Sequence, residues 1–283
     1  MKTLQKTAIS AAAVALLAGL STVAFAADEP AAEVEVSPIT ANVSVVSDYR
    51  YRGISQSNMK PAIQGGFDYA HESGLYIGNW NSSISWNGDQ NPGVTSPIEM
   101  DFYGGFKKEL IGEGFATDFG VLQYAYPTRG GYSYVTYSNK TQVNPNTTEL
   151  YLAQNFTFGA VTGFAKFSYA VSPLFGNPGS TGSYYPDLTV NYDTGVWGLA
   201  INAHVGYQYV SGQNPGSGFP NLNYTDWKLG VTKDFGGGLS LAAAYIGTDA
   251  QKVGNNYAYM GPISQGSKNL AGATGVVSLT KTF

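Results

Sequence analysis

The chain of 283 residues has no cysteine and only two histidines, His71 and His204. It can therefore form no disulfide bond and no thiolate metal site, and it offers no cysteine nucleophile for catalysis. It also lacks calcium-loop spacing and a G-x-S-x-G motif. We accordingly expect no cofactor, no metal centre and no enzymatic activity.

Charge is also scarce. Charged residues make up 12% of the chain, about half the roughly 25% of an ordinary soluble protein. Its only arginines are Arg50, Arg52 and Arg129, which form no basic patch of the kind that binds nucleic acid. Beyond residue 26, no apolar run approaches the 18–20 residues or so that a membrane-spanning helix needs. These absences argue against a nucleic-acid-binding protein and against a helical membrane protein.

The N-terminal residues have the pattern of a secretory signal peptide. A positively charged start precedes an apolar core over residues 8–20 and an A-x-A cleavage site that ends at Ala26. We expect a cleaved signal peptide over residues 1–26, an acidic periplasmic linker over 27–38 and the folded domain over 39–283. Removing the two signal lysines leaves 13 of the 15 basic residues against 19 acidic ones, a net charge of −6.

Glycine and aromatic residues are abundant instead, with 36 Gly, 21 Tyr and 14 Phe. From residue 39 onward, short segments with period-2 alternation are separated by clusters of Gly, Pro, Asn and Ser. In the clearest segment, 196–210, Trp197, Ile201 and Tyr207 share an apolar face, and the residues between them are small or polar. An apolar outer face and a small, polar inner face also explain the mean hydropathy of −0.12. This combination is typical of a transmembrane β-barrel.

Twelve such segments predict an all-β fold, an antiparallel up-and-down barrel. The connections alternate between short and long, which predicts short periplasmic turns and longer extracellular loops. The last segment ends on an aromatic residue, Phe283, as expected of a terminal strand that the barrel-assembly machinery recognises. The segments centre on residues 43–52, 61–71, 74–84, 98–108, 115–126, 147–156, 160–172, 183–193, 196–210, 224–235, 239–248 and 273–283.

The alternation also assigns charged side chains to the lumen of the predicted barrel. One interpretation is a lining that selects ions by charge, and the other is a plug of salt bridges that fills a narrow barrel. Eight strands enclose a filled interior and 16–18 a water-filled channel, so about twelve strands leave both open. The predicted lumen residues are Asp48, Arg50, Arg52, Asp68, Glu99, Asp101, Lys107, Lys166, Asp187, His204, Asp226 and Lys228.

Aromatic residues are expected at the two membrane interfaces, where amphipathic rings anchor a barrel. The first strand contributes two of them, because its tyrosines share a face with Val43 and Val45. The predicted interface aromatics are Tyr49, Tyr51, Trp80, Trp197, Tyr207, Tyr209, Trp227 and Phe283.

Three stretches near the start of the folded domain are similar to a known family. They read SDYRYRGISQS over residues 47–57, PAIQGGFDY over 61–69 and GLYIGNW over 74–80. In this order, over about residues 40–86, the chain resembles the TorF family of outer-membrane porins. The resemblance implies an outer-membrane barrel and a pore, but it transfers no catalytic residue and no substrate.

Together these patterns predict a protein of the bacterial outer membrane that lets small polar solutes or ions diffuse passively. One alternative is a closed barrel with a structural or surface-binding role through its extracellular loops. Another is a lipid-modifying enzyme that uses His204, although a hydrogen-bonded lumen histidine is the simpler interpretation. The expected partners are outer-membrane lipid, the barrel-assembly machinery and small polar solutes or ions, with no nucleic acid.

Overall fold

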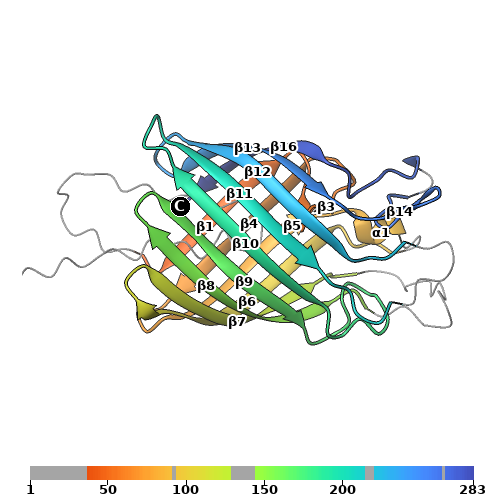
Figure 1. The fold of residues 1–283 in the computed structure, drawn as a ribbon, viewed down its shortest axis with the longest axis horizontal. Helices are drawn as coiled ribbons and strands as arrows, with labels where there is room; N and C mark the ends of the chain where they lie inside the picture. The colour runs from red at the N-terminus through yellow and green to blue at the C-terminus, as the bar shows by residue number, and fades with distance from the viewer. Residues whose placement is uncertain (1–36, 91–93, 129–143, 214–219, 263–264) are drawn as a thin grey trace, which may run out of the picture.

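The structure is a computed structural model that describes residues 37–283 except 91–93, 129–143, 214–219 and 263–264. Twelve strands of the described part form one closed barrel, in which every strand pairs antiparallel with its two neighbours. β1 and β16 pair from Asn42–Thr282 to Val46–Ser278 and so close the ring (Figure 1). The predicted signal peptide and most of the predicted linker lie outside the described residues.

The barrel strands tilt across the wall, and short elements lie in the connections between them (Figure 1). The barrel consists of β1 (Ile39–Val46), β4 (Ala62–Ala70), β5 (Leu75–Ser83), β6 (Ile98–Gly112), β7 (Phe115–Ala125), β8 (Thr147–Phe158), β9 (Val161–Ala170), β10 (Tyr184–Asp193), β11 (Leu199–Gln208), β12 (Tyr224–Asp234), β13 (Leu239–Thr248) and β16 (Thr274–Thr282). The connections contain β2 (Arg50–Tyr51), β3 (Ile54–Ser55), α1 (Trp86–Gln90), β14 (Lys252–Val253) and β15 (Asn256–Tyr257).

The predicted barrel of twelve antiparallel strands is confirmed. Apart from the first segment, each predicted strand coincides with an observed one to within a few residues at either end. The agreement has a physical cause, since a barrel strand must alternate between two different environments along its whole length. No helix in the described part of the chain is long and apolar enough to cross a membrane.

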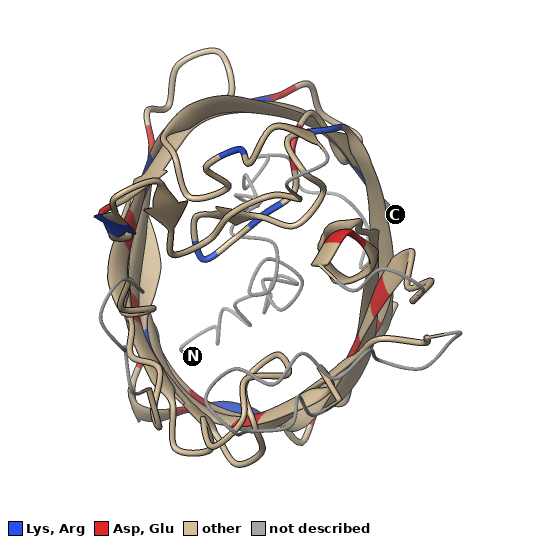
Figure 2. Ribbon diagram, turned by 90° about the vertical axis from the view of Figure 1, so that its right-hand side faces the viewer, with Lys and Arg blue, Asp and Glu red and all other residues tan. Residues whose placement is uncertain are grey.

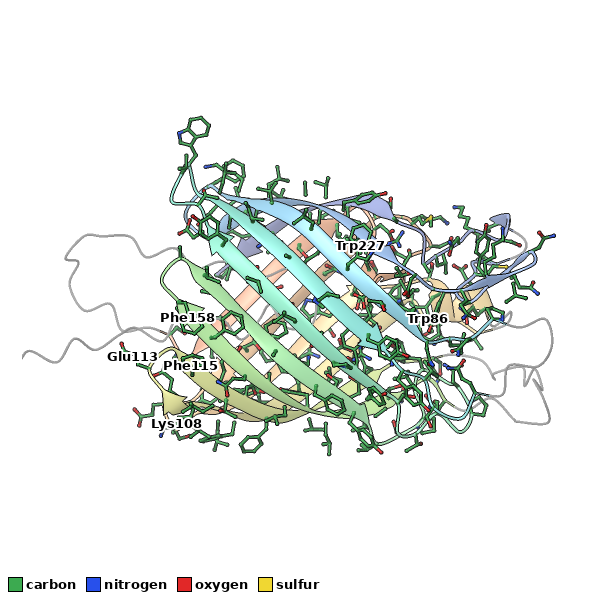
Figure 3. All side chains as sticks on the ribbon, in the orientation of Figure 1. Trp86, Lys108, Glu113, Phe115, Phe158 and Trp227 are labelled. Carbon is green, nitrogen blue, oxygen red and sulfur yellow. The ribbon has the colours of Figure 1, made fainter. Side chains whose placement is uncertain are left out.

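The two ends of the barrel differ, as the alternation of connection lengths predicts. At one end, here called the turn end, the strands are joined by tight turns, such as Gly159-Ala160 between β8 and β9. At the other, the loop end, six longer connections carry the short helix and the small hairpins (Figure 1). Figure 3 shows Phe115 and Phe158 at the turn end and Trp86 at the loop end.

The barrel is apolar outside and polar inside. Ile63, Leu152 and Leu229 project from the outer face of three different strands and are 66%, 56% and 58% exposed. Among the described buried residues, polar and charged side chains outnumber hydrophobic ones, the inverse of a soluble protein. The strands therefore place their apolar face outward around the ring.

Tyrosine rings fill part of the interior by lying against glycines of neighbouring strands. A Cβ atom on Gly206 of β11 would come within 3.0 Å of three atoms of the Tyr185 side chain on β10. Gly120 makes room for Tyr151 in the same way. Glycine in a strand permits this close approach of another group. The pairing accounts for part of the chain's content of both residue types.

We expect Gly206→Val to destabilise the barrel by about 1–3 kcal/mol, the usual cost of overpacking a filled interior. The added methyl groups would displace the Tyr185 ring, whose hydroxyl bonds to Asp226 at 2.8 Å. Urea unfolding of the refolded chain measures the change in stability, with the folded fraction at each urea concentration determined from heat-modifiable gel migration. Gly275→Val is the matched control, because a Cβ at Gly275 meets nothing within 4 Å. Equal effects of the two substitutions would contradict the prediction.

Candidate functional site

The chain leaves the barrel wall after Val46 and turns into the interior. The prediction of one continuous strand over 43–52 is therefore wrong beyond this point. Residues 47–61, here called the crossing loop, contain the small β2–β3 hairpin and return to the wall at β4. Figure 2, which looks onto the loop end, shows loop segments inside the ring of strands.

Polar contacts around Asp48 and Arg50 hold the base of the crossing loop. The Asp48 carboxylate accepts hydrogen bonds from Ser55 Oγ at 2.6 Å and from Arg50 Nε at 2.6 Å. Arg50 also donates to the carbonyl oxygens of Gly53, Leu270 and Gly272, each within 3.0 Å. A buried charge is tolerated when it is paired and hydrogen-bonded, and this pair meets both conditions except at Arg50 Nη2, which is buried without a partner.

Arg52 extends from the tip of the loop to strands on the far wall. Its guanidinium donates to Glu149 of β8 and to Gln208 of β11, both at 2.7 Å. It also lies 4.1 Å from the centre of the Tyr185 ring on β10, within cation–π range. Arg52 has a φ of 46°, a left-handed conformation that a non-glycine residue adopts only when its surroundings hold it there.

Two tyrosines of the crossing loop pack against the part of the wall formed by β5, β6 and β7. The Tyr49 ring meets Trp80 of β5 edge-to-face at 5.5 Å, and its hydroxyl donates to Glu99 of β6. Tyr51 packs edge-to-face on Tyr124 of β7, also at 5.5 Å. Because the loop touches the wall from β5 round to β11, it spans the barrel interior.

These contacts correct the predicted interface aromatics. Tyr49 and Trp80 are only 2% and 3% exposed, and Tyr51 is partly buried, so all three lie inside the barrel. The period-2 pattern of β1 continues through residues 48–52, so the sequence predicts that these residues belong to the same wall strand. Trp80 was predicted to face outward because both faces of β5 carry large and polar residues. The sequence of β5 therefore does not identify its inner face.

The other predicted interface aromatics are at or near the outer surface. Tyr207 and Trp227 project outward and are each 38% exposed, and Phe283 is exposed at the turn end. Tyr209 stacks on Tyr184, with ring centres 4.7 Å apart. Trp197 differs from the prediction, because β11 begins only at Leu199 and Trp197 belongs to the preceding turn. The position of Trp197 at a membrane interface stays a prediction. The same holds for the interface positions of Tyr207, Tyr209, Trp227 and Phe283.

The remaining predicted lumen residues come from the wall and point inward. Asp226 accepts from Tyr185, and Lys166 Nζ lies 5.1 Å from the centre of the Tyr151 ring. Asp68 accepts a hydrogen bond from Tyr103. The inward wall residues are Asp68, Glu99, Asp101, Lys107, Lys166, Asp187, His204, Asp226 and Lys228, all buried or half-buried.

Sequence reasoning missed two inward acids, Asp118 on β7 and Glu149 on β8, each only 1% exposed. Their alternation could have identified them, since Asp118 precedes the exposed Phe119 and Glu149 precedes the exposed Leu150. Adding both to the predicted set changes six acidic against five basic side chains into eight against five. The interior therefore has an acidic excess.

His204 on β11 is bound on both ring nitrogens. Nδ1 lies 2.9 Å from Thr189 Oγ1, and Nε2 lies 2.9 Å from the Tyr185 hydroxyl and 3.1 Å from Asp226. No serine hydroxyl is among these partners. In the described residues, no group of three or more His, Asp and Glu side chains is arranged to hold a metal ion. The arrangement fits a histidine that links three strands, and the absence of enzymatic activity stays a prediction.

The fold and its interior define a closed antiparallel β-barrel with a charged lumen that a loop crosses. Over residues 27–283 the sequence matches a family described as a bacterial protein of unknown function, Gcw_chp, and the chain belongs to that family. No curated protein matches the sequence. The matched family does not carry the TorF name, so the TorF resemblance stays a prediction.

Two solved structures have a similar arrangement of strands. The KdgM porin, in complex with disordered oligogalacturonate, is 7% identical with a TM-score of 0.49, over 87% of this chain and 98% of KdgM. OprD of Pseudomonas aeruginosa is 12% identical with a TM-score of 0.41, over 88% of this chain and 67% of OprD. With TM-scores below 0.5, neither carries an argument here, and the strand pairing itself defines the fold.

Proposed function

We propose that the chain is an outer-membrane porin through which small polar solutes or ions diffuse, with the crossing loop as its constriction. The observation that carries this proposal is a closed barrel whose outer face is apolar all round and whose interior is charged. An apolar belt of this extent would aggregate in water but is stable in lipid. A polar interior of this kind suits water and polar solutes.

The proposal includes an orientation and three partners. The turn end would face the periplasm and the loop end the outside, as the connection lengths favour. The outer face would contact lipid, and the β16 strand, up to Phe283, would be read by the barrel-assembly machinery. A signal peptide over residues 1–26 would direct export, and membership of the TorF porins would agree with this role.

A closed barrel that acts through its loops is the second candidate, and the crossing loop itself favours it. The loop reaches walls on opposite sides, and the Arg52–Glu149 pair that holds it is 6% and 2% exposed on its two side chains. Residues packed this closely could seal the lumen. The two functions differ in one observable, the passage of ions through the isolated barrel.

Planar-bilayer recording of the refolded chain tests the porin proposal. We expect discrete conductance steps from protein that is recovered in the outer-membrane fraction and migrates heat-modifiably on gels. Recovery in the soluble periplasm would refute the membrane location. A correctly folded barrel without conductance steps would refute the porin and favour the closed barrel. His204→Ala should leave the conductance steps intact. Loss of a lipase-type activity in this variant would instead support the alternative of a lipid-modifying enzyme that uses His204.

We expect the channel to prefer cations, because the lumen carries eight acidic against five basic side chains among those named above. The reversal potential in a KCl gradient measures the preference. It should weaken as ionic strength rises, since salt screens charge over about 10 Å at 0.1 M. Anion preference at low salt would contradict the prediction.

A further inference from the structure

A cavity of about 200 Å³ lies at the loop end, bounded on one side by the crossing loop. Tyr51, Ser55 and Gln56 of that loop form part of its lining. The other five loop-end connections complete it, for example through Trp86 of α1 and Tyr259 of the β13–β16 connection. Figure 3 shows Trp86 at this end of the barrel. The cavity is thus built by every connection that reaches the loop end.

The lining is uncharged but not apolar. Among the described residues that line the cavity, none is Asp, Glu, Lys, Arg or His, although the lumen beyond the crossing loop is rich in charge. Burial raises the pKa of the Tyr259 phenol, which keeps it neutral. Five amide side chains line the cavity, including Gln56, Asn177 and Gln208. Six aromatic side chains accompany them: Tyr51, Trp86, Tyr126, Phe175, Tyr224 and Tyr259.

This chemistry restricts the ligand. An ion would find no opposite charge in the lining to offset its loss of water. The amide N–H groups of Gln56 and Asn177 already donate to backbone carbonyl oxygens, but a purely apolar molecule would leave their amide oxygens without a donor, which also costs free energy. The ligand that satisfies both kinds of side chain is neutral and carries hydroxyl groups around an apolar ring face. A cavity of about 150 Å³ can hold one benzene ring, so this one has room for a single substituted six-membered ring.

We infer that the cavity binds a pyranose ring of a neutral sugar, with a ring face against the aromatic side chains and hydroxyls on the amides. The inference deepens the proposed porin function, on which it rests, by naming the solute class that enters at the loop end. The site itself does not depend on ion passage.

The aromatic wall is held in position before any ligand arrives. The backbone N–H groups of Ser85 and Trp86 donate to the Gln56 carbonyl oxygen at 2.9 and 3.2 Å, which joins α1 to the crossing loop. The Trp86 ring meets Tyr126 edge-to-face at 5.3 Å. Tyr259 donates to the Leu222 carbonyl oxygen at 2.7 Å and packs on Tyr224. A preorganised lining favours binding because less side-chain freedom is lost.

Saturation-transfer NMR with methyl α-D-glucopyranoside, on the folded chain in a detergent without a sugar headgroup, tests the inference. We expect transfer to the ring protons, and much weaker transfer to methyl α-D-glucopyranosiduronate, in which a carboxylate replaces the C6 hydroxymethyl group. Trp86→Ala should weaken binding roughly tenfold, the loss expected when a large aromatic contact is removed. Gln56→Leu removes an amide at similar volume and should also weaken it. Trp197→Ala, at the opposite end of the barrel, is the matched control.

Heat-modifiable migration of each variant first establishes that it folds. Absence of transfer to the glucoside would overturn the inference, as would equal transfer to the glucuronide or binding that survives both Trp86→Ala and Gln56→Leu. Failure of the proposed porin function is distinguishable, since this measurement needs no current. A barrel that binds the glucoside but does not conduct would support the binding site and refute the pore. A barrel that conducts but does not bind would support the pore and refute the binding site.

Discussion

Removing the crossing loop should raise the single-channel conductance several-fold. In the variant, an Asn-Gly pair replaces residues 47–61 and joins Val46 directly to Ala62. These two residues already face each other in the β1–β4 pairing, and Asn-Gly forms the two-residue turn that such a hairpin favours. The barrel wall is left intact, and the segment that spans its interior is gone. Planar-bilayer recording of the wild type and the variant, in the same salt, measures the change.

A matched loop deletion controls for a general effect of shortening. Replacing residues 252–257, the β14–β15 hairpin, by Asn-Gly removes a separate two-stranded sheet at the loop end that is not part of the closed barrel. The Ala258 N–H already donates to the Gln251 carbonyl oxygen at 2.9 Å, so this gap can also be closed by a short turn. We expect little change in conductance. If the two deletions change conductance equally, the crossing loop is not the constriction.

Breaking the buried ion pair between Arg52 and Glu149 should cause the largest loss of stability from a single substitution. Arg52→Met leaves the Glu149 carboxylate buried without its cation, and such a charge typically costs about 3–5 kcal/mol. Glu149→Gln should act in the same direction, because it leaves the guanidinium without its counter-charge. The double variant should lose less than the sum of the two, since neither charge is then isolated. Urea unfolding of the refolded barrel measures all three.

Lys252→Met provides the comparison at an exposed cation. Lys252 lies over the Tyr257 ring at 4.7 Å but is open to solvent, so its loss should cost no more than about 1 kcal/mol. A loss below about 1 kcal/mol for Arg52→Met as well would mean that water reaches the Arg52–Glu149 pair and screens it as at a surface. In that case the crossing loop would not be anchored by this pair.

Much of the barrel was predictable from the sequence, because each strand separates two unlike environments. In β11, Ile201 and Val205 alternate with Asn202 and Gly206, and the structure places the first pair outward and the second inward. The same period identifies Asp118 and Glu149 as inward residues, although sequence analysis overlooked them. The alternation of short and long connections follows from the antiparallel closure of the ring. These features depend on near neighbours in sequence, which a pattern can report.

The candidate site depended on contacts that no local pattern contains. The stretch from Asp48 to Arg52 alternates as a wall strand would, yet it forms the crossing loop. The partners that hold it are far away in sequence: Glu149 lies 97 residues from Arg52, and the Leu270 carbonyl oxygen lies 220 residues from Arg50. Only closure of the barrel brings them within hydrogen-bonding distance. The sequence alone therefore determined the wall and its two faces, while the tertiary structure decided what crosses the lumen, because burial and pairing of these charges exist only once the ring is closed.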